Sequence, residues 1–166
     1  LFAIIYLFLA QPHQVVGNSM LPNFHDKEYI LTDKISYRFR LPERGEVIVF
    51  KAPNNLGKDY IKRIIGKPQD KILIRDGKVF LNDRLLAENY LPPDLKTFAG
   101  SFIKEGLIYE VTPRTYFVLG DNRMNSSDSR EFGFVKQEAI IGKSFFVYWP
   151  PPAFSIIPTP EYDLTR

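Results

Sequence analysis

One strand stands out in the middle of this 166-residue sequence: Tyr60-Ile61-Lys62-Arg63-Ile64-Ile65. Its β-branched and aromatic residues favour a strand, and the following Gly66-Lys67-Pro68-Gln69-Asp70 predicts a turn. Because side chains alternate along a strand, Lys62 shares a face with Tyr60, and Ile61 points the other way. Burial among apolar side chains lowers the pKa of a lysine, which could make Lys62 a general base. Taken alone, however, Lys62 also fits a solvated strand lysine.

Further short apolar and β-branched runs lie on both sides, at residues 29–32, 47–50, 71–75, 78–81, 115–119 and 140–149. Long periodic runs of helix formers are scarce, and 13 Pro and 10 Gly punctuate the chain. Asp76-Gly77 between two of the runs predicts a tight hairpin. The sequence therefore predicts a mostly β fold, with antiparallel strands in a sheet or barrel.

The composition excludes several classes of protein. Hydrophobic residues make up 45% of the chain, with 14 Phe and 9 Tyr, so a sizeable core can be buried. The net charge of +3 is small and its basic residues are scattered, so nucleic acid is not expected as a partner. The chain has no cysteine, which excludes disulfides, thiolate catalysis and cysteine-based zinc sites.

A candidate nucleophile lies in the segment Gly17-Asn18-Ser19-Met20-Leu21-Pro22. A serine hydroxyl needs a neighbouring base to become nucleophilic. The two histidines, His13 and His25, have no carboxylate at a recognisable spacing, so Lys62 is the better candidate for the base of Ser19. The alternative is a turn serine that only forms local hydrogen bonds.

A polar loop supplies the third element, from residue 120 to residue 130: Gly120-Asp121-Asn122-Arg123-Met124-Asn125-Ser126-Ser127-Asp128-Ser129-Arg130. It can lock itself through an Asp–Arg ion pair and present a hydroxyl toward a lysine amine. An ordinary surface loop and a divalent-cation loop are the alternatives. The cation loop is disfavoured by its two arginines and by the lack of calcium-loop spacing.

The domain organisation follows from changes in composition. We interpret residues 1–11 as the C-terminal part of a truncated transmembrane anchor, because the apolar run is shorter than the roughly 20 residues of a full span. A buried first strand or helix and a signal-peptide core are the alternatives. Residues 12–75 and 115–150 are predicted to form the catalytic β domain, 76–114 an inserted β-rich lobe remote from the chemistry, and 151–166 a tail.

Four blocks of this sequence together resemble the type I signal peptidases. They are the Ser19 segment, Arg44-Gly45-Glu46-Val47-Ile48-Val49-Phe50, the strand and turn from Tyr60 to Asp70, and the 120–130 loop with Phe132-Gly133. They occur in the family's order and approximate spacing. The resemblance runs from the apolar start to about Trp149, with the 76–114 lobe as its variable part.

The resemblance implies a membrane-bound serine endopeptidase that cleaves signal peptides from secretory pre-proteins after small residues at −3 and −1. Ser19 matches the nucleophile and Lys62 the general base, and neither metal nor cofactor is required. The matched supporting residues are Ser126, which orients the lysine, the Asp128–Arg130 ion pair, Asp121 and Arg63. The matched substrate-binding residues are Gln14, Val15, Val16, Met20, Phe24, Val49, Tyr60 and Ile61.

The same resemblance implies a location at the plasma membrane or thylakoid, with a single anchor and the catalytic domain on the extracytoplasmic or lumenal face. The lipid bilayer is then a partner. The aromatic and proline-rich end around Trp149 either rests on the bilayer surface or packs on the core. Gly17 departs from those members that carry a serine there to complete the oxyanion hole, so one oxyanion donor besides the Ser19 N–H is unassigned.

Two other functions fit parts of the sequence. A self-cleaving repressor-type peptidase also uses a Ser–Lys pair on a related β fold, but the apolar start and the 120–130 loop argue against it. A non-catalytic, membrane-tethered β module is the second alternative, which the filled catalytic positions disfavour.

Overall fold

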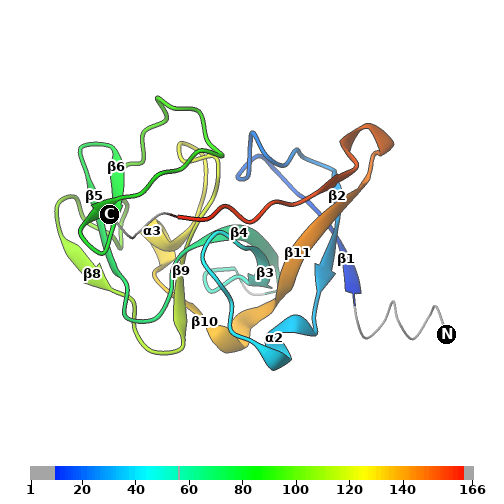
Figure 1. Cartoon of the computed structure of the whole chain (residues 1–166), viewed down its shortest axis with the longest axis horizontal. Helices are drawn as coiled ribbons and strands as arrows, with labels where there is room; N and C mark the ends of the chain where they lie inside the picture. Colours follow the sequence, from blue (N-terminus) through cyan, green and yellow to red (C-terminus); the bar gives the residue numbers. More distant parts are fainter. Residues whose placement is uncertain (1–9, 56, 163–166) are drawn as a thin grey trace.

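Two antiparallel sheets form the molecule in the computed structural model, which describes residues 10–55 and 57–162 (Figure 1). The larger sheet has the strand order β1-β2-β11-β3-β4-β9-β10, and β12 pairs with β11. Its strands are β1 (Ala10–Gln14), β2 (Tyr29–Asp33), β3 (Val47–Lys51), β4 (Asp59–Gly66), β9 (Thr115–Leu119), β10 (Val135–Lys136), β11 (Ile140–Trp149) and β12 (Ser155–Ile156). The prediction of a mostly β, antiparallel fold is confirmed.

The second sheet has the order β7-β6-β5-β8 and forms a separate lobe. Its strands are β5 (Lys71–Arg75), β6 (Lys78–Leu81), β7 (Arg84–Leu85) and β8 (Ile108–Glu110). Asp76 and Gly77 join β5 to β6 with φ angles of 53° and 75°, which suits the tight hairpin that this dipeptide predicts. The lobe thus includes β5, although the predicted boundary at residue 76 left that strand in the catalytic domain.

Helical structure is confined to single turns in the described part of the chain. These turns are α2 (Ser36–Phe39), α3 (Ser129–Phe132), η1 (Gln137–Ala139) and η2 (Pro151–Ala153). Within residues 10–55 and 57–162, no helix is long and apolar enough to cross a bilayer. Most of the predicted anchor segment, residues 1–9, lies outside the described residues. Its last two residues belong to β1 instead, where Ala10 is aligned with Asp33 of β2.

The two sheets share a continuous core where β4 and β9 meet the lobe. Ile65, Phe117 and Leu119 of the larger sheet pack with Ile72 and other apolar residues of the lobe. Burying one such side chain stabilises the fold by roughly 1.5–3 kcal/mol. This shared core holds the lobe against the strand that carries Lys62.

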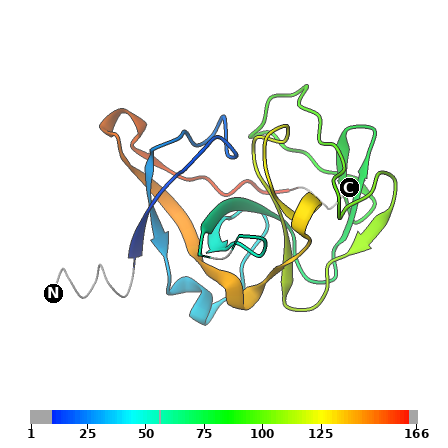
Figure 2. The same cartoon turned by 180° about the vertical axis from the view of Figure 1, so that it is seen from behind.

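The segment after β11 folds back over the molecule and does not extend away from it. Figures 1 and 2 show it crossing from the β11 hairpin toward the lobe. Phe146 of β11 is aligned with Ile156 of β12, and Ile157 is buried in the core of the larger sheet. Tyr162 packs against the core of the lobe. The predicted tail is therefore part of the folded domain at least as far as Tyr162.

Candidate active site

Ser19 lies at the start of a tight turn that follows the extended segment after β1. The backbone N–H groups of Asn23 and Phe24 donate to the carbonyl of Met20, which forms one helical turn behind the serine. The backbone N–H of Asn122 donates to the Ser19 carbonyl at 3.0 Å. Its side-chain amide donates to the Asn18 carbonyl at 2.9 Å. The 120–130 loop therefore holds the backbone on which the Ser19 hydroxyl is mounted.

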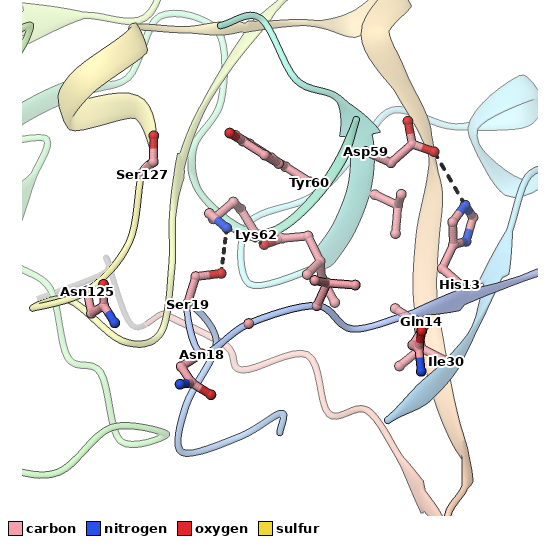
Figure 3. Close-up of a pocket in the computed structure, with 14 residues that line it drawn as sticks. His13, Gln14, Asn18, Ser19, Ile30, Asp59, Tyr60, Lys62, Asn125 and Ser127 are labelled. Carbon is pink, nitrogen blue, oxygen red and sulfur yellow. Dashed lines mark hydrogen bonds and ion pairs between the residues drawn. The ribbon is translucent and has the colours of Figure 1, made fainter. Parts of the chain in front are cut away.

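Lys62 comes from the middle of β4 and points at Ser19 (Figure 3). Its Nζ donates to Ser19 Oγ at 2.8 Å and to the Ile61 carbonyl at 2.8 Å. The residue is only 3% exposed. Burial lowers the pKa of Lys62 to about 8, because the ammonium loses its hydration, while the carboxylates of Asp128 and Asp121 partly oppose this effect. A substantial fraction of the lysine is therefore neutral near pH 8 and able to accept a proton.

Two buried ion pairs support this dyad. Arg63, next to Lys62 on β4, donates to both carboxylate oxygens of Asp121 at 2.9 and 2.7 Å. Arg130 donates to both oxygens of Asp128 at 2.8 and 2.9 Å. Such two-point pairing fixes the geometry as well as the charge. The structure thus brings four of the predicted supporting residues together around Lys62.

Each of the two carboxylates also organises the local backbone. Asp128 caps helix α3 by accepting from the Arg130 N–H, and its other oxygen accepts from the Gly120 N–H at 3.0 Å. Asp121 accepts from the side-chain amide of Asn23 at 2.8 Å. These bonds connect the two ends of the loop to one another and to the turn behind Ser19.

Ser126, the predicted orienting residue, occupies the same loop. Its Oγ is buried and forms no hydrogen bond within residues 10–55 and 57–162, so the expected bond to Lys62 is absent from the structure as it stands. Ser126 Oγ and the Ser19 carbonyl both crowd against Gly120. An added Cβ on Gly120 would lie 2.1 Å from the hydroxyl and 2.5 Å from the carbonyl oxygen. Only glycine therefore allows both groups to approach at this point.

A cleft of about 490 Å³ runs past the dyad. Five of the eight predicted substrate-binding residues line it: Gln14, Val16, Val49, Tyr60 and Ile61. The remaining three, Val15, Met20 and Phe24, do not line this cleft; they are buried in the core of the larger sheet. Because side chains alternate along an extended chain, Val15 points into the core when its two neighbours face the cleft.

Sequence reasoning missed several residues of the cleft. His13, Asn18, Asn125 and Ser127 also line it, together with Asp59, which the motif position already predicts to flank the substrate (Figure 3). The sequence suggests His13 only as a partner for Ser19, and no spacing in it indicates that His13 faces Asp59.

The lobe is not remote from the chemistry, contrary to the sequence-based interpretation. The guanidinium of Arg123 is fully buried and pairs with Glu88 of the lobe, with Nη1 2.7 Å from Oε2. Arg123 also donates to the Gly120 carbonyl, and its own carbonyl accepts from Arg130. The Tyr90 ring covers the Arg63 guanidinium, with 4.3 Å between the guanidinium carbon and the ring centroid. The segment after β7 therefore packs directly on both ion pairs.

Comparison with known proteins agrees with this arrangement. Residues 1–149 match the family model described as signal peptidase, peptidase S26. The chain is 37% identical to the probable signal peptidase I-2 of Synechocystis, over 92% of this chain and 69% of that protein. It is 38% identical to the signal peptidase I of Bacillus caldolyticus, over 92% of this chain and 87% of that protein.

A solved structure gives the same picture. A signal peptidase I from Enterococcus faecalis superposes with a TM-score of 0.52 at 32% identity, over 63% of this chain and 97% of that chain. The family model covers most of the chain, and both relatives extend over most of their own length. This chain therefore belongs to the signal peptidase family, peptidase S26.

Proposed function

We propose that this chain is the catalytic part of a type I signal peptidase, which cleaves signal peptides from secretory pre-proteins after small residues at −3 and −1. Ser19 is the nucleophile and Lys62 the general base. The observation that carries this assignment is the 2.8 Å contact between Lys62 Nζ and Ser19 Oγ, two residues that line a cleft of about 490 Å³.

The reaction follows from this contact. Neutral Lys62 accepts the proton of Ser19 Oγ as the oxygen bonds to the scissile carbonyl carbon. Lys62 then passes this proton to the leaving amine, and the peptide C–N bond breaks to form an acyl-enzyme. Lys62 next takes a proton from water as the water oxygen attacks the ester carbon, and it returns this proton to Ser19 Oγ when the acyl C–O bond breaks. The backbone N–H of Ser19 stabilises the oxyanion in both steps.

The supporting residues act through position and charge. The Ser126 hydroxyl is buried without a hydrogen-bond partner among the described residues, which is unfavourable. It is therefore available to form a hydrogen bond with the Lys62 amine. The Asp128–Arg130 and Asp121–Arg63 pairs hold the loop and place negative charge near Lys62. That charge limits how far burial lowers the pKa of Lys62.

The substrate binds as an added strand in this proposal. It lies between residues 14–16 and residues 59–61, where backbone groups give affinity and alternate side chains enter pockets. Val16, Val49 and Ile61 form an apolar wall that suits alanine-sized side chains at −1 and −3.

The molecule carries an exposed apolar hairpin at the end of β11, which we assign to the bilayer surface. Trp149, Phe154 and Ile156 are 53%, 58% and 79% exposed there. Tryptophan is favoured at membrane–water interfaces. In this proposal the catalytic domain lies on the extracytoplasmic or lumenal face of a plasma or thylakoid membrane. Serine substitutions at all three residues should reduce sedimentation with anionic vesicles, whereas Ile108→Ser in the lobe should not.

The catalytic assignment is tested by incubating the protein in detergent with a pre-protein that has Ala at −3 and −1. Ser19→Ala and Lys62→Ala should abolish cleavage at that site. Ser101→Ala and Lys78→Ala, at exposed positions away from the cleft, should retain it. Cleavage that persists in the Ser19 or Lys62 variant would refute the mechanism.

A further inference from the structure

A second pair of polar side chains lines the cleft away from the dyad (Figure 3). His13 comes from β1 and Asp59 from the first position of β4, and both line the cleft. His13 Nε2 lies 3.9 Å from Asp59 Oδ2 (Figure 3). The cleft thus contains Ser19 and Lys62 in one part and a polar, titratable pair in another, and apolar side chains such as Val49 and Ile61 also line it.

One ring nitrogen of His13 has a hydrogen-bond partner and the other has none among the described residues. Its Nδ1 is 3.0 Å from the Thr32 hydroxyl. Its Nε2 is buried, and no group within residues 10–55 and 57–162 forms a hydrogen bond with it. The 3.9 Å separation from Asp59 exceeds hydrogen-bond length. Burial also lowers the pKa of His13, which favours the neutral ring. A buried polar atom in this state needs a partner, and the cleft is where that partner can lie.

Asp59 complements this nitrogen. Its Oδ1 accepts from Lys51 Nζ at 2.7 Å, which leaves Oδ2 facing His13. A small polar group can lie about 2.8 Å from both His13 Nε2 and Asp59 Oδ2 when those atoms are 3.9 Å apart. Because an ionised carboxylate only accepts hydrogen bonds, the group between them has to be a donor.

The spacing along β4 indicates which substrate residue reaches this point. Asp59 precedes Lys62 by three residues, which is about 10 Å along a strand. A substrate strand with its −1 residue beside Ser19 and Lys62 therefore has its −4 residue level with Asp59 and its −5 residue immediately beyond. The apolar part of the cleft, around Val16 and Ile61, then lies beside −3 to −1.

We propose that His13 and Asp59 form a polar subsite that binds a hydrogen-bond donor side chain, such as a hydroxyl or carboxamide, four or five residues upstream of the cleaved bond. This inference rests on the proposed function and adds a specificity determinant to it. The subsite selects a polar residue next to the small residues at −3 and −1, and it disfavours an apolar side chain there because the buried His13 Nε2 would stay unpaired.

The test uses two peptides that have Ala at −3 and −1 and differ only at −4 and −5. One has Gln at both positions and the other has Leu. The wild-type protein should cleave the Gln peptide with a kcat/KM on the order of tenfold higher, the size expected for a hydrogen bond to a charged group. His13→Phe and Asp59→Asn should bring this ratio close to one. His25→Phe, at the exposed second histidine, should keep the wild-type ratio.

Each outcome has one meaning. Equal kcat/KM values for the two peptides with the wild-type protein, or a preference for Leu, overturn the subsite and leave the proposed function intact. A wild-type ratio of kcat/KM for the Gln and Leu peptides in folded His13 and Asp59 variants also overturns the subsite and leaves the proposed function intact. Failure of the wild-type protein to cleave either peptide counts against the proposed function itself. If a variant fails to fold, as judged by its thermal transition, the comparison of the two peptides with the wild-type protein still tests the subsite.

Discussion

Lys62 Nζ lies 2.8 Å from Ser19 Oγ and the same distance from the carbonyl oxygen of its strand neighbour Ile61. The second contact ties the end of a flexible side chain back to β4. The amine is therefore aimed at the serine before any substrate binds, and the entropy of ordering this long side chain is lost on folding and not during catalysis. The predictions below follow from this contact and from the groups around it.

The activity should depend on pH through Lys62. The ammonium form cannot accept the serine proton, and the pKa of Lys62 is lowered to about 8. We expect kcat/KM for a peptide substrate to rise about tenfold per pH unit below pH 8 and to level off above it. A pH–rate profile measures this. A plateau that already begins near pH 6 would show that another group is the base.

Lys62 should lower stability at neutral pH. Its pKa falls from 10.5 in the unfolded chain to about 8 in the folded protein. Between these values the unfolded chain binds more protons, so the free energy of unfolding rises with pH across this window. Below pH 8 the full cost of about 3 kcal/mol is present. Lys62→Met should raise the free energy of unfolding at pH 7 and flatten its rise between pH 8 and 10.5.

Urea unfolding at pH 7 and pH 9.5 measures both effects of the Lys62→Met change. Lys78→Met, at an exposed position of β6, is the matched control and should alter neither. A Lys62→Met protein that is less stable than wild type at pH 7 would contradict the prediction.

Asp128→Asn should affect both stability and the pH profile. It leaves the buried Arg130 guanidinium without its carboxylate, which costs about 3–5 kcal/mol. It also removes a negative charge that raises the pKa of Lys62, so the rising part of the pH–rate profile should move to lower pH. Glu138→Gln, at an exposed ion pair, should change neither measurement. An unshifted profile would show that Asp128 does not act on Lys62.

Glu88→Gln should show that the lobe contributes to catalysis. Arg123 is fully buried and would lose its carboxylate partner, so we expect a loss of about 2–4 kcal/mol in the free energy of unfolding. Arg123 donates to the Gly120 carbonyl, so kcat should fall as the loop beside Ser19 loosens. The matched control is Glu110→Gln on the exposed face of β8. Wild-type kcat in the Glu88 variant would mean that the lobe does not position the loop.

Gly120→Ala should disrupt the site sterically. The new methyl group would lie 2.5 Å from the Ser19 carbonyl oxygen and 2.1 Å from Ser126 Oγ, so the backbone behind the nucleophile has to move. Overpacking of this kind costs about 1–3 kcal/mol. We expect near-complete loss of cleavage together with a lower melting temperature. Adding Ser126→Gly should restore little activity, because the clash with the Ser19 carbonyl remains.

Local signals in the sequence predict the strands, and the order of its motifs predicts the pairing of Ser19 with Lys62. β-branched runs and turn residues are local signals, so the antiparallel β fold and the Asp76-Gly77 hairpin could be predicted from short segments. The order of the motifs likewise matches Ser19, Lys62 and the 120–130 loop to a single family of proteins. These features depend on residue type and spacing along the chain, which a sequence displays directly.

Which residues meet across the cleft and beneath it depends on how distant segments pack in the folded chain. The contacts of His13 with Asp59, Glu88 with Arg123, and Tyr90 with Arg63 join segments far apart in the sequence. The same long-range packing places Val15, Met20 and Phe24 in the core. Their apolar side chains are removed from water there, as they would be in a substrate pocket. An apolar residue beside a nucleophile suits either a pocket or a core, and only the packing of distant strands distinguishes the two.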